Sequence, residues 1–466
     1  MPLNPTQQTF ITKNPIAKNI LRMVQLALPI TIGQLAIVGM SVTDIIIAGR
    51  FSTDDLAAVT LGSTIFNLSI MLVIGILLAN GAIIGQLFGA GNHRVLRQQF
   101  QSCLWLCLPL GLLCASFMGL GMLLLPQLDT TENISRIATN YLLPMSGTAF
   151  LLPYLISFRT SFESMNQARP AMIFNLAGFL LNIPLDYALV TGYGGFPALG
   201  GAGCGWATLS ISLFIVISEL IYTLYARNLQ SYHLLRPLVP VNIERIKETL
   251  SIGLPIGGAI LAEGGFFLLI PLLIAHLGAV TVSGHSVALS FDWIMFMVPM
   301  GISQAISILV AQELGQNQPR RAQHLCVTGL GLTATIALCQ AGFVILFRHQ
   351  IAALFSPDVA VQELAASLLV YAAAFRVFDA INIGGNGALR GYKDTRITVL
   401  LAITGYWIVG FPLSYSLALT NYWGPAMGVE GFWVGMVIAL TLTAGLTTTR
   451  LYFTAKKALS LRSSTQ

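Results

Sequence analysis

The chain has 466 residues, of which 55% are hydrophobic and only 9% are charged, with a formal net charge of +6 at pH 7. This is too few charged side chains to cover the surface of a water-soluble protein of this length. The composition therefore excludes a soluble globule and indicates an integral membrane protein. The basic residues are scattered over short loops and form no stripe with aromatic residues, so we expect no nucleic-acid partner.

Long hydrophobic runs recur along the chain, and each is long enough to cross a hydrocarbon layer of about 30 Å as a helix. They are too long for transmembrane β-strands, so we predict an all-α membrane protein. Charged residues, glycines and prolines separate twelve candidate spans, at residues 20–49, 56–88, 100–125, 138–160, 170–191, 200–226, 250–276, 280–312, 323–347, 361–386, 397–420 and 428–453.

The positive charges are distributed unevenly between the two sides of these spans. If the N-terminus is cytoplasmic, twenty of the 24 Lys and Arg residues lie on the cytoplasmic side, while Arg50, Arg136 and Arg348 lie in outer loops and Arg376 lies inside a span. The positive-inside rule therefore predicts a multi-pass protein of the cytoplasmic (inner) membrane with both termini in the cytoplasm.

The two halves of the sequence repeat at a nearly constant offset. Aligning position 27 with position 253 brings ALPI onto GLPI, and aligning position 184 with position 412 brings PLDY onto PLSY. We predict an N-lobe at 1–226, a cytoplasmic linker at 227–249 and a C-lobe at 250–466. Each lobe has six spans, an even number, so a pseudo-two-fold axis along the membrane normal should relate them.

Acidic residues inside membrane spans are costly and usually mark an ion or substrate pathway. Asp379 lies eleven residues before Arg390, which is about 16 Å of helix, and is therefore deep in its span. Glu263, among glycines in the same half, could share a low-dielectric site with it and bind a proton or a hard cation. The alternative is an internal ion pair between Asp379 and Arg376, which share a helix face. Asp292 could join these C-lobe acids.

The N-lobe contains a second candidate site. Asn182 and Asp186 are four residues apart, so they share one helix face. If that face meets Asp44, the three residues form an oxygen-rich pocket; the alternative is an ordinary polar contact between helices. Glu219 lies close to Arg227, and we interpret it as a solvated helix end rather than part of a site.

Three motifs resemble the multidrug and toxic compound extrusion transporters, specifically their NorM-like branch. They are VTDIIIAG around Asp44, LPIGGAILAE ending at Glu263, and DAINIGGNGALRGYKDT from Asp379 to Thr395. The resemblance covers nearly the whole chain. It implies twelve helices in two six-helix lobes, and export of amphipathic, often cationic, drugs or toxic metabolites by alternating access in antiport with Na⁺ or H⁺.

The resemblance also implies which residues bind the coupling cation and the substrate. Carried over by motif, Glu263 and Asp379 form the C-lobe pair, and Asp44, Asn182 and Asp186 form the N-lobe site; either set could hold Na⁺. Asp292 stands where a small polar residue is expected. We expect no cofactor other than the coupling ion, a monomer in the lipid bilayer, and no enzyme, since paired His and acid motifs are missing from the sequence. The alternatives are a flippase for lipid-linked precursors and an exporter of non-drug metabolites.

Overall fold

The computed structural model describes residues 15–127 and 131–463, and this part of the chain contains helices and loops but no strand. Twelve of the described helices are long and apolar enough to cross a membrane, which confirms the predicted all-α class and number of spans. The six in the first half are α2 (Pro15–Phe51), α3 (Thr53–Gly89), α4 (His93–Leu124), α5 (Glu132–Ser164), α6 (Ala168–Thr191) and α7 (Gly201–Tyr225).

The second half contains the other six spans. They are α9 (Ile243–Ile274), α10 (Ala279–Gly315), α11 (Pro319–Phe355), α12 (Val359–Gly391), the continuous run α13–η4–α14 (Arg396–Ala402, Ile403–Gly410 and Phe411–Leu419), and α15 (Val429–Ser463). The short helix α8 (Arg227–Gln230) follows α7. The predicted polar linker at 227–249 is thus partly helical, because α9 begins at Ile243, before the predicted start of the seventh span.

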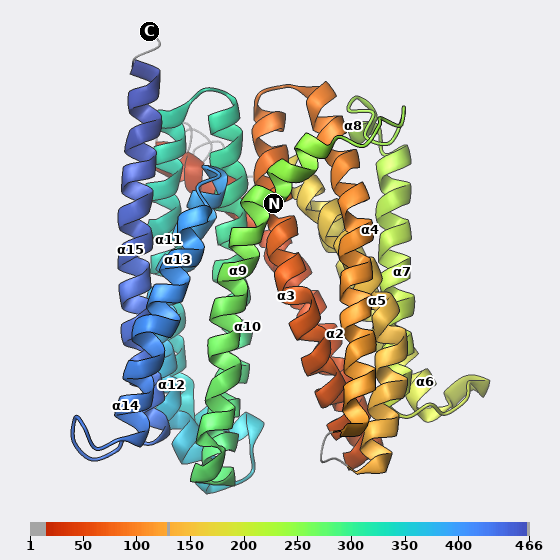
Figure 1. The fold of residues 1–466 in the computed structure, drawn as a ribbon, viewed down its shortest axis with the longest axis vertical. Coiled ribbons are helices and arrows are strands. Elements are labelled where there is room, and N and C mark those ends of the chain that lie inside the picture. The colour runs from red at the N-terminus through yellow and green to blue at the C-terminus, as the bar shows by residue number, and fades with distance from the viewer. Residues whose placement is uncertain (1–14, 128–130, 464–466) are drawn as a thin grey trace, which may run out of the picture. The chain divides into compact units, whose positions relative to one another are not determined.

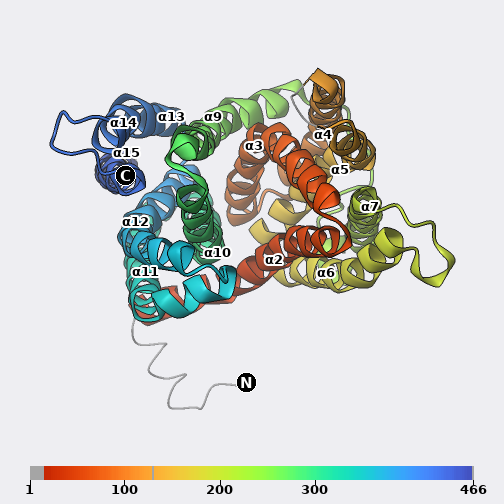
Figure 2. The same cartoon turned by 90° about the horizontal axis from the view of Figure 1, so that it is seen from below.

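The chain divides into two compact units, one formed by Ile32–Gly257 and the other by residues up to Thr31 together with Gly258–Gln466. In the first unit α5 is central and packs against α3, α4 and α7. In the second, α12 is central and packs against α10, α11 and α15, as Figures 1 and 2 show. The lobe limits at 226 and 250 remain predictions.

The helices of the two halves begin and end at equivalent positions of the sequence repeat. α3 and α10 are equally long, with 37 residues each, and the alignment that brings ALPI onto GLPI superimposes both their starts and their ends. α6 and the run α13–η4–α14 likewise both have 24 residues, and the alignment of PLDY with PLSY superimposes their ends. Even the left-handed turn after α3, at Gly91 with φ 67°, recurs at the equivalent position Asn317 with φ 57°. The two halves therefore have the same order of helices.

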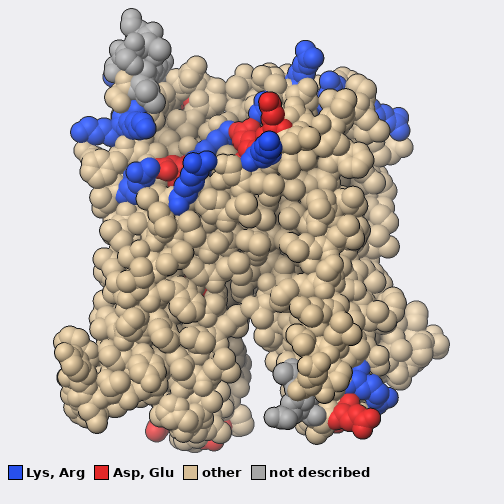
Figure 3. Space-filling model, in the orientation of Figure 1, with Lys and Arg blue, Asp and Glu red and all other residues tan. Residues whose placement is uncertain are grey.

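Large apolar side chains point outward along the helices, as with Leu123, Leu346 and Leu354, which are 72%, 71% and 84% exposed. On the face drawn in Figure 3, the sides of the helices are almost free of Lys, Arg, Asp and Glu, and the blue side chains gather near the helix ends. A surface of this kind is stable against lipid and would aggregate in water.

Candidate functional site

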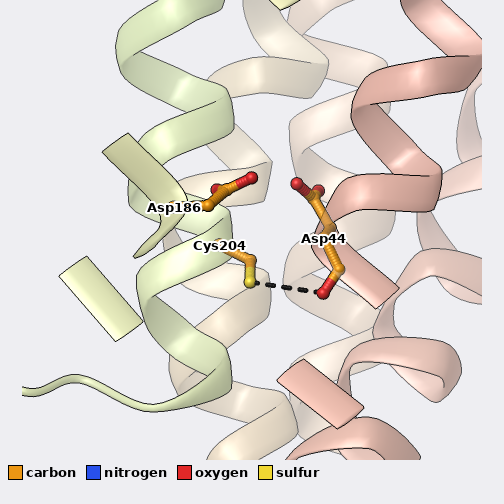
Figure 4. Close-up of side chains that lie close together, drawn as sticks. All are labelled: Asp44, Asp186 and Cys204. Atoms are coloured by element: carbon orange, nitrogen blue, oxygen red, sulfur yellow. Dashed lines mark hydrogen bonds between the residues drawn. The ribbon is translucent and has the colours of Figure 1, made fainter. Parts of the chain in front are cut away.

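The N-lobe residues singled out in the sequence lie together in the unit formed by Ile32–Gly257. Asp44 on α2, Asp186 on α6 and Cys204 on α7 each place one side-chain ligand atom so that all three lie within 4.8 Å of one another. Figure 4 shows the two carboxylates pointing toward each other across the gap between their helices, with the Cys204 thiol beside them. All three side chains are buried.

Few protein groups bind these carboxylates. The Thr208 hydroxyl donates to Asp44 Oδ2 at 3.1 Å, and the Cys204 thiol donates to the Asp44 carbonyl oxygen at 3.6 Å. Asp44 Oδ1, both carboxylate oxygens of Asp186 and both amide atoms of Asn182 are buried without a hydrogen-bond partner. We call Asp44, Asn182, Asp186, Cys204 and Thr208 the Asp44 cluster.

Buried polar atoms without partners are costly, at about 1–3 kcal/mol each, and two neighbouring carboxylates repel each other in a low-dielectric site. A proton or a cation between them would remove both costs. The free atoms of Asp44, Asp186 and Asn182 include four oxygens, which suit a hard cation such as Na⁺, whereas the Cys204 thiol is a soft ligand and does not. The donor set therefore fits a proton or a hard monovalent cation.

Small residues at the start of α7 bring this helix close to α6. A Cβ atom added to Gly203 would stand 2.7 Å from the carbonyl carbon of Leu189 on α6. The start of α7 is also tied to α3, because the Gly201 amide donates to Asp55 Oδ1 at 2.5 Å. This close approach of α7 carries Cys204 and Thr208 to the carboxylate of Asp44.

In the other unit, Arg376 holds the C-lobe acids. Its Nη1 lies 2.5 Å from Asp379 Oδ2, its Nε donates to Asp292 Oδ1 at 3.0 Å, and its Nη2 pairs with Asp292 Oδ2. The Arg376 side chain is only 4% exposed. The internal ion pair, which the sequence left open as the alternative for Asp379, is therefore present, and Asp292 joins the C-lobe acids through the same guanidinium.

Glu263 has a different hydrogen-bond partner from Asp292 and Asp379. The Tyr406 hydroxyl donates to Glu263 Oε1 at 3.0 Å. Among the described residues no hydrogen bond joins Glu263 to Asp379. The predicted C-lobe pair is thus not a direct carboxylate contact, because Arg376 and Tyr406 each bind one of its members.

Tyr406 was not identified from the sequence. It lies in η4, a stretch of π-helix, which is a rare form often found at functional sites. The next residue, Trp407, donates from its indole nitrogen to the Ala262 carbonyl oxygen at 2.8 Å, tying η4 to α9 beside Glu263. A buried phenol in an apolar span needs a polar partner. A tyrosine inside a predicted span was therefore the sequence feature that could have identified this residue.

A small pocket adjoins Arg376 and Asp292. Two aromatic rings lie beside the Arg376 guanidinium. Its Cζ is 5.2 Å from the centroid of the Phe296 ring and 5.8 Å from that of the Phe375 ring, and these distances suit cation–π attraction. Apart from the two charged residues and Gln340, the pocket has an apolar lining of Phe291, Met295, Ala341, Val344, Leu369, Ala372 and Ala373. Its volume of about 10 Å³ has room for about one water molecule.

The expectation that Glu219 is a solvated helix end was wrong. Its side chain lies inside the unit formed by Ile32–Gly257 and is 1% exposed, since α7 is covered there by α5 and α6. Proximity in sequence was a poor guide because the facing helix decides the environment.

Comparisons with known proteins find relatives along most of the chain. The family model named MatE matches residues 29–188 and 255–416. A protein of Pseudomonas aeruginosa named multidrug resistance protein PmpM is 36% identical over 438 residues, covering 93% of this chain and 91% of that protein. Multidrug resistance protein MdtK of Yersinia pseudotuberculosis is 35% identical over 437 residues, covering 93% of this chain and 95% of that protein.

Solved structures share the fold. A multidrug resistance MATE family transporter of the MOP superfamily, in an outward-facing conformation, superposes with a TM-score of 0.85 at 20% identity and covers 96% of this chain and 97% of that one. The eukaryotic MATE transporter AtDTX14 gives a TM-score of 0.80 at 20% identity, with 96% and 99% covered.

Proposed function

The chain belongs to the MatE family of membrane transporters, and from that premise we propose that it exports drugs or toxic metabolites in exchange for Na⁺ or H⁺. Export of drugs is supported by its likeness to PmpM and MdtK, both named multidrug resistance proteins. The acids inside the spans favour amphipathic and often cationic substrates. The protein works in the cytoplasmic membrane with both termini in the cytoplasm, and exchange proceeds by alternating access.

The observation that carries the proposal is the set of buried oxygens without partners in the Asp44 cluster. An exchanger needs a site that is costly when empty and stable when a cation is bound, so that binding and release can drive a change of state. Asp44, Asn182 and Asp186 meet this requirement. We therefore assign the coupling cation to the N-lobe, with these three residues as its ligands.

We assign the substrate to the C-lobe acids. Glu263, Asp292 and Asp379 supply three carboxyl groups, of which the guanidinium of Arg376 binds Asp292 and Asp379. A cationic compound would be attracted to these carboxyl groups, and the aromatic rings of Phe296 and Phe375 beside Arg376 would contact its ring system. A bound cation would compete with Arg376 for the carboxylates.

The test uses purified protein in proteoliposomes, with ethidium as a cationic amphipathic substrate and an imposed gradient of either Na⁺ or H⁺. We expect gradient-driven ethidium transport by the wild type, and a loss of about tenfold or more in Asp44→Asn and Asp186→Asn, because each removes a charge that the cation needs. Asp54→Asn, a carboxylate near the start of α3 that binds Asn133, is the matched control.

Two outcomes would count against the proposal in different ways. Wild-type protein that transports ethidium under neither gradient contradicts cation-coupled export. Normal coupled transport in both Asp44→Asn and Asp186→Asn, with losses only in Glu263→Gln and Asp379→Asn, would move the coupling cation to the C-lobe.

A further inference from the structure

The loop that joins α8 to α9, residues 231–242, is held against α4 by one side chain. Gln101 Nε2 donates to the carbonyl oxygens of Leu234 at 2.9 Å and of Pro237 at 3.1 Å. The Val239 amide donates in turn to Gln101 Oε1 at 2.7 Å. Three hydrogen bonds to one buried amide group fix the course of the backbone here. The side chains that this loop exposes are therefore part of the folded structure.

The loop crosses a face of α4 that is apolar and exposed further along the helix. Trp105, Leu108 and Leu112 follow Gln101 by four, seven and eleven residues, which places all four on one side of α4. The first three are 51%, 43% and 54% exposed, whereas Gln101 is buried beneath the loop. An exposed apolar face on a membrane span meets lipid. The loop therefore lies on the lipid-facing side of α4.

The loop also lies at the level of the membrane surface. Gln101 is eight residues after His93, where α4 begins, and this is about 12 Å of helix. Trp105 lies one turn further in, and an exposed tryptophan is typical of the boundary between headgroups and hydrocarbon. On the face drawn in Figure 3, the basic side chains gather near the helix ends, as expected at the headgroups. Depth and direction together place the loop among lipid headgroups.

The loop and the start of α9 expose both apolar and basic side chains. Leu238 and Ile243 are 79% and 63% exposed, and Val241 between them is 46% exposed. Arg236 precedes Leu238 by two residues and is exposed as well. Lys247 follows Ile243 by one turn of α9, so these two exposed residues share a helix face. Apolar and basic groups therefore alternate along one short stretch of the chain.

The charges of this stretch favour a negatively charged ligand. Arg245 Nη1 pairs with Glu248 Oε2 at 2.8 Å, so these two charges offset each other. The exposed cations Arg236 and Lys247 then outnumber the exposed acid Glu244. A phospholipid with a negative headgroup matches both features, because its phosphate attracts the cations and its acyl chains accept the apolar side chains. A dissolved anion would leave the apolar side chains in water.

We propose that the loop between α8 and α9, together with the start of α9, binds an anionic phospholipid of the adjoining leaflet. On the proposed topology this is the cytoplasmic leaflet. Arg236 and Lys247 contact headgroup phosphates, while Leu238, Val241 and Ile243 enter the boundary between headgroups and acyl chains. This inference goes beyond the proposed function, because lipid binding at this surface needs neither the coupling cation nor the exported compound.

The first test measures lipid affinity by native mass spectrometry of the purified full chain in detergent, titrated with phosphatidylglycerol or phosphatidylcholine. We expect the wild type to bind phosphatidylglycerol at least about fivefold more tightly than phosphatidylcholine. The double variant Arg236→Gln, Lys247→Gln should lose at least about threefold of that preference. The matched control, Arg320→Gln with Arg321→Gln, removes two exposed cations at the start of α11 and should bind both lipids as the wild type does.

The second test locates the apolar side chains in a bilayer. A bimane label is attached at Leu238→Cys in a Cys339→Ser background, because Cys339 is exposed whereas the other five cysteines are buried. The protein is reconstituted with phosphatidylglycerol that carries brominated acyl chains, which quench bimane on contact. We expect at least about twofold quenching at position 238. The control label at Arg94→Cys, seven residues before Gln101 and about 10 Å further out along α4, should be quenched little.

Each result bears on the lipid site alone. Equal affinity of the wild type for the two lipids, or an unchanged preference in the double variant of Arg236 and Lys247, overturns the choice of an anionic lipid. A label at position 238 that is quenched no more than the label at position 94 overturns the placement of the loop in the bilayer. Gradient-driven ethidium transport tests the proposed function separately, and its outcome does not depend on either lipid measurement.

Discussion

Arg376 Nε donates to Asp292 Oδ1 at 3.0 Å, joining α12 to α10 across 84 positions of the chain. The same guanidinium holds Asp379 on its own helix. Asp292 departs from the small polar residue that the family resemblance implies at this position, and Arg376 is the cation that compensates it. The two residues therefore act as a matched pair in the C-lobe.

Removing Arg376 should destabilise the protein strongly. Arg376→Gln leaves Asp292 and Asp379 buried without their cation, and breaking a buried ion pair from one side typically costs about 3–5 kcal/mol. We expect a marked fall in the thermal unfolding temperature in detergent. Arg320→Gln, at an exposed position near the start of α11, is the control and should change little.

The pairing itself can be measured by a double-mutant cycle. If Arg376 and Asp292 interact as described, Asp292→Asn should be less harmful in the Arg376→Gln background than alone, with a coupling energy of about 1 kcal/mol or more. Additive effects of the two substitutions would contradict the matched pair.

Tyr406→Phe tests the partner of Glu263. The change removes only the hydroxyl that donates to Glu263 Oε1, and the loss of this part-buried hydrogen bond should destabilise the protein by about 0.5–1.5 kcal/mol. Ethidium affinity should change with it, because Glu263 would be free to move. Tyr415→Phe, half-exposed on the adjoining α14, is the control; equal behaviour of the two variants would show that Tyr406 does not position Glu263.

Gly203→Ala tests the close approach of α7 to α6. Its new Cβ would stand 2.7 Å from the backbone of Leu189, and overpacking of this kind costs about 1–3 kcal/mol. We expect a lower unfolding temperature and weaker cation dependence of transport, since Cys204 and Thr208 would shift from Asp44. Gly119→Ala on α4 meets no atom within 4 Å and should leave both measurements unchanged. A tolerated Gly203→Ala would contradict the role given to this contact.

The hydrogen bonds of Asp394, in the loop between α12 and α13, should make the stability of the protein depend on pH. Burial alone would raise the pKa of Asp394, but hydrogen bonds from Arg450 and Thr454 outweigh it and hold the pKa below its ordinary value of 3.8. Arg450 Nε donates at 2.8 Å and Thr454 Oγ1 at 2.6 Å, both to Asp394 Oδ2. A lowered folded-state pKa means that this contribution to stability is complete above pH of about 4 and is lost as the pH falls through the folded-state pKa.

The measurement compares the wild type with Asp394→Asn across pH. We expect the wild type to be more stable at neutral pH by no more than about 1 kcal/mol, because Arg450 is 43% exposed and water screens the pair. The difference should shrink in acid and in about 1 M salt. A difference that persists unchanged at low pH would assign it to packing rather than to the ion pair.

Several features could be predicted from the residues alone. Hydropathy identifies a span wherever enough apolar residues follow one another, and the repeat of the two halves follows from matching motifs such as PLDY and PLSY. The spacing of Asn182 and Asp186 correctly indicated one shared helix face. These features depend on residues close together in the chain or on direct comparison of its halves.

The sequence by itself determined the membrane class, the twelve helices, the repeat and the presence of acids inside the spans. Only the tertiary structure decided what each acid meets: Asp44 faces Asp186, Asp379 binds Arg376, Glu263 binds Tyr406, and Glu219 is buried on α7, which packs against α5. The physical reason is that helical periodicity places residues on a face, whereas the rotation and packing of whole helices determine which faces meet. Hydrogen-bond partners and compensating charges follow from that packing.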